Sequence, residues 1–251
     1  MTTESRRSPD GVRLTHDQAV EVALNDPVAR AALAANPRVA QARKLYADGA
    51  SGLLADLATV GFPGISVVGE LQRLGDYRVA VPILVRWLGR VNYLPLAVDI
   101  VRALSVKFAL DEAFPVLVDL FRVPPQFEDP LRPTTSEPPS EHFRAVVGSA
   151  LSTFAGPSTG DDLISLAADR SYGEARALIV AALPKTKDPR VLGLLLRLLE
   201  DPTVAPFAVE ALGKLKALSA RERVADMLDS ADKNVRDQAK KALKRIDSLG
   251  C

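Results

Sequence analysis

The chain has 251 residues, of which 47% are hydrophobic, 25% charged and only 5% aromatic. A core built from this composition must be packed mainly with Ala, Leu and Val. Lys and Arg number 32 against 31 for Asp and Glu, so the net charge of +1 excludes a global attraction to nucleic acid or to an anionic membrane.

Cysteine content and apolar runs indicate the environment. Cys251 is the single cysteine, which excludes an internal disulfide or a cysteine metal site and favours a reducing compartment. No run approaches the roughly 18 uninterrupted apolar residues of a membrane-spanning helix, and residues 1–13 lack the apolar core of a signal peptide. We therefore expect a soluble, cytoplasmic protein with no membrane partner.

The N-terminal part of the chain predicts a tail followed by a helical cap. Residues 1–13 are polar and without periodicity, so we expect a disordered tail. Asp26-Pro27 and Asn36-Pro37 each place an N-cap residue before a proline, which is typical of a helix start. Helices within residues 14–50, ending near Gly49, would cover the first apolar face of the elements that follow.

Regular helix pairs are predicted from Ser51 onward. A first helix through Leu57 is followed, after a glycine- and proline-containing break, by a partner that ends at Leu74. Pro82 lies early in the next first helix, and Pro115 holds the same place 33 residues later. Because proline is tolerated in the first turn of a helix, we interpret both as marks of a helix start rather than a kink.

A proline-rich segment, residues 123–140, lies between the two helices of one pair. It contains six prolines, so it cannot be a regular helix. We expect an extended loop that projects from the turn and contributes little to stability. Its run Pro130-Leu131-Arg132-Pro133 fits a PxxP ligand of polyproline-binding domains, although so short a pattern also arises by chance.

The C-terminal part of the chain contains the clearest repeat. Residues 201–215 return 31 residues later, with Asp201 matched by Asp232. Both copies place apolar residues on one helical face, and two of these are alanines small enough for close helix packing. A repeat of this length indicates stacked helix pairs. Equivalent positions in the second helices of six pairs, within residues 51–246, are Glu70, Ala103, Ala150, Ala182, Ala211 and Ala242.

Two runs carry a resemblance to a known family. One extends from Leu74-Gly75-Asp76 to Val81-Pro82-Ile83-Leu84, and the other from Asp232 through Val235-Arg236 to Ala242-Leu243. They resemble the HEAT-repeat family, specifically the short bacterial HEAT-like repeats named after phycobilisome lyases. The resemblance implies an all-α fold, a right-handed α-solenoid of about six helix pairs behind an N-terminal helical cap, with residues 247–251 as a tail. It does not imply lyase activity, because only the repeat type is shared.

The sequence offers no catalytic or metal-binding constellation. His16 and His142 are the two histidines, and neither lies in a His-Glu-x-x-His motif or in the repeated His-Glu pairs that a HEAT-repeat hydroxylase would imply. Asp161 and Asp162 precede an apolar helix, so we interpret them as N-capping residues with favourable charge at the positive helix end. We expect Trp87 in the core. We predict no enzyme activity, no cofactor and no metal; a bilin lyase-like activity is the enzymatic alternative.

The resemblance also implies where a partner binds, because the second helices of HEAT-like solenoids line the concave face. The side of these helices opposite their shared apolar stripe is small or apolar along most of the chain and basic at its end. We predict a protein partner at Val98, Val101, Arg102, Ala177, Val180, Ala181, Val209, Glu210, Lys240, Lys241 and Lys244. The alternative is tight curvature, which would bury Val101, Val180 and Val209 as core.

The basic end of the chain leaves a second function open. From Lys214 onward there are ten basic residues against six acidic ones, with Lys240, Lys241 and Lys244 in the last helix. These lysines suit either nucleic-acid binding or a solvated end cap that places cations at the negative helix terminus. We predict a non-enzymatic scaffold or adaptor that binds another protein, with nucleic-acid binding as the alternative and the oligomeric state left open.

Overall fold

The computed structural model describes residue 27 and residues 36–133 and 136–248. The chain divides into two compact units, residues 1–48 and residues 49–251. In the first unit the described residues form the start of α3 (Pro37–Thr59), where the Asn36 side-chain oxygen accepts a hydrogen bond from the Arg38 backbone N–H at 3.0 Å. The predicted tail and the helices predicted before Asn36 lie outside the described residues, apart from Pro27.

Helix α3 continues without interruption through Gly49 and ends at Thr59. The break predicted near Gly49 is therefore wrong. Ala50, Leu53 and Leu57 are completely buried on one face of this stretch, and their packing outweighs the low helix propensity of glycine. The division of the chain into a cap and a solenoid stays a prediction.

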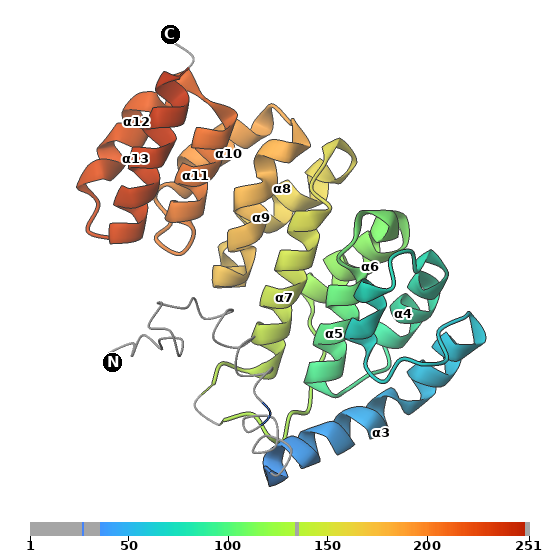
Figure 1. Ribbon diagram of the computed structural model, residues 1–251. Coiled ribbons are helices and arrows are strands. Elements are labelled where there is room, and N and C mark those ends of the chain that lie inside the picture. Colours follow the sequence, from blue (N-terminus) through green and yellow to red (C-terminus); the bar gives the residue numbers. More distant parts are fainter. Residues whose placement is uncertain (1–26, 28–35, 134–135, 249–251) are drawn as a thin grey trace. The chain divides into compact units, whose positions relative to one another are not determined.

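The second unit is a row of helix pairs, and the second helices of successive pairs contact one another in chain order (Figure 1). The first helices are the end of α3, α4 (Val81–Leu88), α6 (Leu110–Arg122), α8 (Gly160–Ala168), α10 (Arg190–Leu198) and α12 (Arg221–Asp226). The second helices are the 3₁₀ helix η1 (Val68–Arg73), α5 (Leu94–Leu104), α7 (Pro139–Thr153), α9 (Ala177–Ala182), α11 (Ala205–Leu215) and α13 (Lys233–Asp247). This arrangement confirms the all-α solenoid; its handedness stays a prediction.

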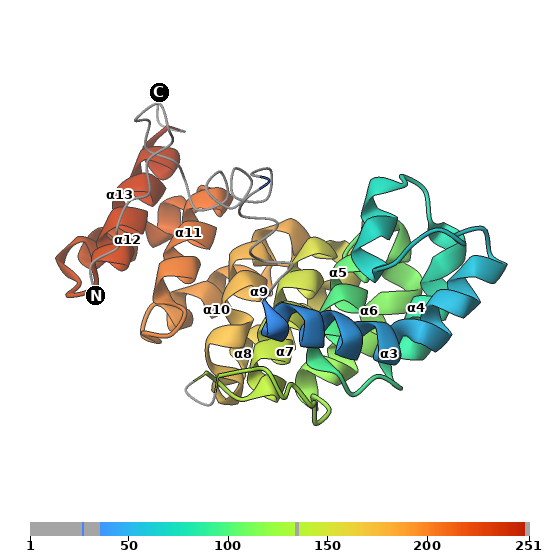
Figure 2. The same ribbon diagram turned by 60° about the horizontal axis from the view of Figure 1, so that its bottom comes forward.

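Short 3₁₀ turns precede or follow several of these helices, and Figure 2 shows the order of α4 to α13 from a second direction. The turns are η2 (Arg78–Ala80), η3 (Lys107–Ala109), η4 (Pro157–Thr159), η5 (Arg170–Arg176), η6 (Leu183–Thr186), η7 (Leu218–Ala220) and η8 (Met227–Asp229). A full helix was predicted where η1 lies. Gly69 lowers the helix propensity of this segment, and Gly75, two residues after its end, has a positive φ of 83°, so a single 3₁₀ segment forms instead.

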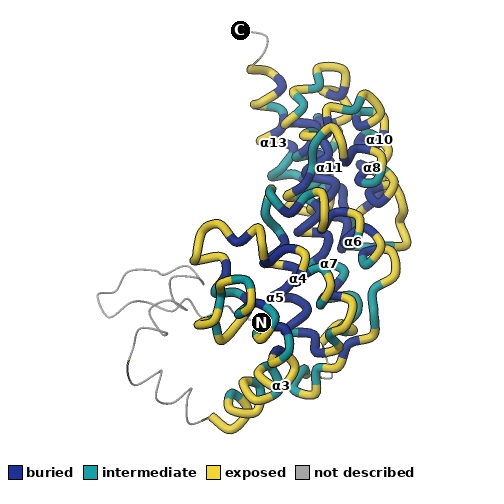
Figure 3. Tube along the Cα trace, turned by 90° about the vertical axis from the view of Figure 1, so that its right-hand side faces the viewer, coloured by how far each residue is buried: buried dark blue, intermediate teal, exposed yellow. Residues whose placement is uncertain are grey.

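Small residues let the second helices approach closely. The aligned alanines of α5, α7, α9, α11 and α13 are all 5% exposed or less. A Cβ atom on Gly213 of α11 would lie 2.7 Å from the Ala242 Cα atom of α13, and one on Gly148 of α7 would lie 2.2 Å from the Ala175 carbonyl oxygen. Figure 3 shows buried stretches of the chain along α5 and α11. The core therefore depends on glycine and alanine at the helix crossings.

The two prolines predicted to hold the same place differ in the structure. Pro82 is the second residue of α4, as predicted, whereas Pro115 is the sixth residue of α6 and lies inside the helix. The first-turn interpretation of Pro115 is wrong because α6 begins about one turn earlier, at Leu110. Asp111 and Glu112 occupy that added turn, where acidic side chains are favourable at the positive helix end.

The proline-rich segment does connect two helices, α6 and α7, but it packs on the solenoid instead of projecting from it. Glu128 donates its backbone N–H to the Asn92 carbonyl at 2.7 Å and accepts from the Leu94 N–H at 3.1 Å. The Phe127 side chain is 9% exposed, and its ring centroid lies 4.5 Å from that of the buried Phe143 in α7. The prediction of a projecting loop is therefore wrong, because two backbone hydrogen bonds and a buried aromatic side chain hold the segment on the solenoid.

The PxxP run inside this segment is folded into a turn. The Arg132 backbone N–H donates to the Asp129 carbonyl at 3.0 Å, and the Arg132 guanidinium Nε donates to the Glu137 carbonyl at 3.1 Å. A polyproline-binding domain requires an extended polyproline II segment. The conformation of Pro130–Pro133 is not that of a PxxP ligand.

Candidate partner-binding surface

The apolar part of the predicted binding site is buried. Val101, Val180 and Val209 are completely inaccessible, Val98 is 6% exposed, and Ala177 and Ala181 are 8% exposed. The neighbouring second helices contact one another, which covers the positions that an open groove would display. The predicted apolar groove is wrong at these six residues. Val101, Val180 and Val209 are buried as core, as the alternative expected.

The polar members of the predicted site remain accessible. Arg102 and Lys240 have side chains 63% and 65% exposed, that of Glu210 is 29% exposed, and Lys241 and Lys244 are also exposed. Ser149 of α7 occupies the position equivalent to Arg102 in the next pair and is exposed as well. We call the set Gln72, Arg102, Ser149, Glu210, Lys240, Lys241 and Lys244 the second-helix surface.

Contacts between pairs hold parts of this surface in place. The Gln72 amide donates to the Arg102 carbonyl at 2.8 Å, which joins η1 to α5. Lys214 lies 2.9 Å from Glu210 in its own helix and donates to the Ala181 carbonyl at 3.2 Å, which joins α11 to α9. These hydrogen bonds join η1 to α5 and α9 to α11 beside the second-helix surface.

The C-terminal end of the surface is its most basic part. Lys240 lies 3.9 Å from Asp237, while Lys241 and Lys244 have no ion-pair partner within 4.0 Å among the described residues. The end of α13 is fixed by Asp247, whose carboxylate accepts from Arg221 at 2.7 Å. That hydrogen bond lowers the pKa of Asp247. Two lysines at this end are therefore free to meet an acidic partner.

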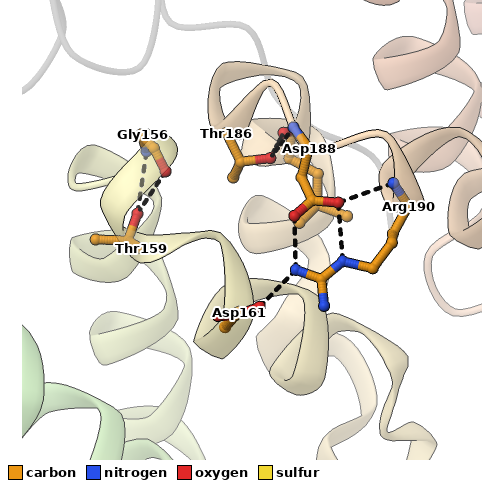
Figure 4. Close-up of polar contacts among 7 residues, drawn as sticks. Gly156, Thr159, Asp161, Thr186, Asp188 and Arg190 are labelled. Carbon is orange, nitrogen blue, oxygen red and sulfur yellow. Dashed lines mark hydrogen bonds and ion pairs between the residues drawn. The ribbon is translucent and has the colours of Figure 1, made fainter.

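The remaining predicted positions have structural roles. Asp161 and Asp162 lie in the first turn of α8 but do not cap it; they pair with Arg190 and Arg122, respectively (Figure 4 shows the former). Trp87 is half-buried, packs where a side chain on Gly52 would clash, and donates its indole N–H to Asp56 at 2.7 Å. This hydrogen bond lowers the pKa of Asp56.

One of the two histidines lies in the described part of the chain. His142 contacts Glu137 at 3.0 Å through its ring Nδ1, and His16 lies outside the described residues. The described residues contain no group of three or more His, Cys, Asp or Glu side chains placed to hold a metal ion. Within the same residues, no helix combines the length and the apolar composition needed to cross a bilayer.

One buried ion pair was not predicted from the sequence. The guanidinium group of Arg176 in η5 is 1% exposed, and it donates to Asp201 ahead of α11 and to the Ala167 carbonyl at 3.0 Å. Burial opposes ionisation of Asp201, but the arginine and the Thr203 N–H outweigh it and lower the pKa of this carboxyl. A repeated aspartate could have pointed to this ion pair. Aspartates at 169, 201 and 232 precede the second helices of successive pairs, and each carboxylate accepts a hydrogen bond from the backbone N–H two residues later.

Comparisons with known proteins give a family match over part of the chain and two remote likenesses to solved structures. Residues 160–244 match the family model described as HEAT repeats. No curated protein matches the chain. A designed armadillo repeat protein is 16% identical, with a TM-score of 0.43 over 90% of this chain and 97% of its own. An engineered protein from a structural genomics consortium is 18% identical, with a TM-score of 0.46 over 92% of this chain and 59% of its own. Residues 160–244 therefore resemble HEAT repeats, and the stacked helix pairs continue on the N-terminal side of this match.

Proposed function

We propose that this protein is a non-enzymatic scaffold that binds a protein partner through the second-helix surface. Stacked helical repeats build extended surfaces that commonly mediate protein interactions. The observation that supports this surface most directly is the pair of exposed lysines, Lys241 and Lys244, which have no ion-pair partner within 4.0 Å among the described residues.

The charge of the surface defines the partner that it favours. Arg102 near one end and the three lysines of α13 at the other are exposed, with Glu210 and Ser149 between them. A protein surface with carboxylates spaced to meet both ends would gain specificity and association rate from this pattern. The near-zero net charge of the chain favours a protein partner over the phosphate backbone of nucleic acid, whose non-specific binding requires broad basic surfaces.

The test compares two charge-reversed variants of equal net charge. Lys241→Glu with Lys244→Glu alters the surface, and Lys107→Glu with Arg197→Glu alters exposed residues of η3 and α10 outside it. Affinity capture from the source organism with quantitative mass spectrometry should recover a partner with wild type and with the control pair, but not with the lysine pair of α13. Equal recovery by both variants would refute the proposed surface. Salt-sensitive retention of nucleic acid that is lost with the same lysines would favour the alternative function.

A further inference from the structure

A cleft of about 410 Å³ lies between the turn that follows α9 and the end of α11. Its apolar walls include Pro184, Leu192, Leu215 and Ala217, each of which is half-buried and so retains accessible surface. Lys187 lines the cleft, and Lys216 lies in the chain between two lining residues. The cleft therefore combines apolar walls with one lining cation, Lys187, and a second lysine, Lys216, lies between two lining residues in the chain. None of the residues of the second-helix surface lines it.

Both lysines have a backbone conformation that disfavours them. Lys187 and Lys216 have φ angles of 58° and 51°, and they are the non-glycine residues with positive φ in the described part of the chain. They hold equivalent places, directly after η6 and α11 in successive pairs. Glycine is the usual residue at such a helix end because a Cβ atom is strained there. Stability alone would favour glycine at both positions, which points to a use for the two side chains.

The local charge is positive because the one carboxylate that lines the cleft is already neutralised. Asp188 accepts from the Arg190 backbone N–H at 2.8 Å and from its guanidinium group at 2.6 and 2.9 Å (Figure 4). Lys187 and Lys216 are exposed and have no ion-pair partner within 4.0 Å among the described residues. The buried Thr186 hydroxyl donates to the Leu183 carbonyl at 2.8 Å and accepts from the Asp188 N–H at 3.3 Å, which holds the turn that presents Lys187.

We propose that this cleft binds an acidic segment of a partner protein, with one apolar side chain between Pro184, Leu192 and Leu215 and with carboxylates beside Lys187 and Lys216. The apolar walls select for a peptide over a sugar–phosphate chain, which has no apolar side chain to bury. The two lysines select for acidic flanks around that side chain. This site is additional to the second-helix surface and can bind independently of it.

The experiment uses a short fluorescent peptide of glutamates around one leucine, with binding measured by anisotropy. Lys187→Gly with Lys216→Gly removes both charges and also relieves the backbone strain, so its melting temperature should equal or exceed that of wild type. Peptide affinity should fall by about tenfold or more, the effect of about 1.4 kcal/mol of lost interaction. Lys107→Ala with Lys233→Ala, which removes two exposed lysines elsewhere, should bind the peptide like wild type.

Three results would overturn the proposal. The first is equal peptide binding by wild type and by the glycine pair. The second is equal binding of a peptide in which serine replaces the leucine, since the cleft would then have no occupant. The third is equal or tighter binding of oligothymidylate with the same loss in the glycine pair, which would make the site a nucleic-acid contact. Should the glycine pair lose its fold, the asparagine pair, which also tolerates positive φ, supplies the same comparison.

Discussion

Replacing Phe127 with alanine tests whether the proline-rich segment is part of the folded core. The ring of Phe127 is 9% exposed and lies 4.5 Å from the ring of Phe143, which is completely buried. Truncation of a buried phenylalanine costs about 3 to 5 kcal/mol, and the lower end applies to a loop that can partly relax, so we expect a loss of about 3 kcal/mol. Part of this loss comes from the uncovered face of Phe143.

The assay is urea unfolding followed by far-ultraviolet circular dichroism, with Val123→Ala as the matched control. Val123 lies in the same segment and is 77% exposed, so its truncation should change the free energy of unfolding by less than about 0.5 kcal/mol. The reasoning is refuted if the alanine variants at Phe127 and Val123 unfold at the same urea concentration, as they would if the segment projected into solvent.

Three further changes test other contacts. Gly213→Ala should destabilise the protein by about 1 to 3 kcal/mol, because the added Cβ meets the next second helix. The control Gly193→Ala, in the open middle of α10, should increase the stability by up to about 1 kcal/mol. An increase in stability for both variants would show that the helices are not in close contact. Asp201→Asn should lower the free energy of unfolding in urea by about 3 kcal/mol, because it leaves a buried arginine unpaired. A decrease no larger than that caused by Asp247→Asn, at an exposed ion pair, would contradict this. Asp188 has a pKa of about 2, below its ordinary 3.8, so its stabilising effect is present at neutral pH and lost as the pH falls through this interval. The melting temperatures of wild type and Asp188→Asn should therefore converge in acid, and a constant difference would contradict the assignment.

The repeat architecture could be predicted because each pair repeats the same packing requirement. Alanine at Ala103, Ala150, Ala182, Ala211 and Ala242 marks where one second helix meets the next, and this pattern is visible without any structure. The helix start at Asn36-Pro37 could be predicted in the same way, because an N-cap residue and a proline have local roles.

What the sequence did not reveal depends on contacts between distant residues. Helical periodicity gives the side of a helix but not how close its neighbours come, so Val101 and Val180 fitted a groove as well as a core. Proline content suggested a projecting loop, since nothing local tells that Phe127 meets Phe143. The positive φ angles of Lys187 and Lys216 follow from how the helices end, and lysine gives no sign of that conformation.

The central claim is that a protein partner covers the second-helix surface, and lysine acetylation footprinting measures this directly. The protein alone and the complex captured from the source organism are acetylated briefly, and modification of each lysine is read by mass spectrometry. We predict protection by the partner at Lys240, Lys241 and Lys244, with Lys107 modified equally in both samples. Unchanged modification of the three lysines of α13, or equal protection at Lys107, would contradict the account.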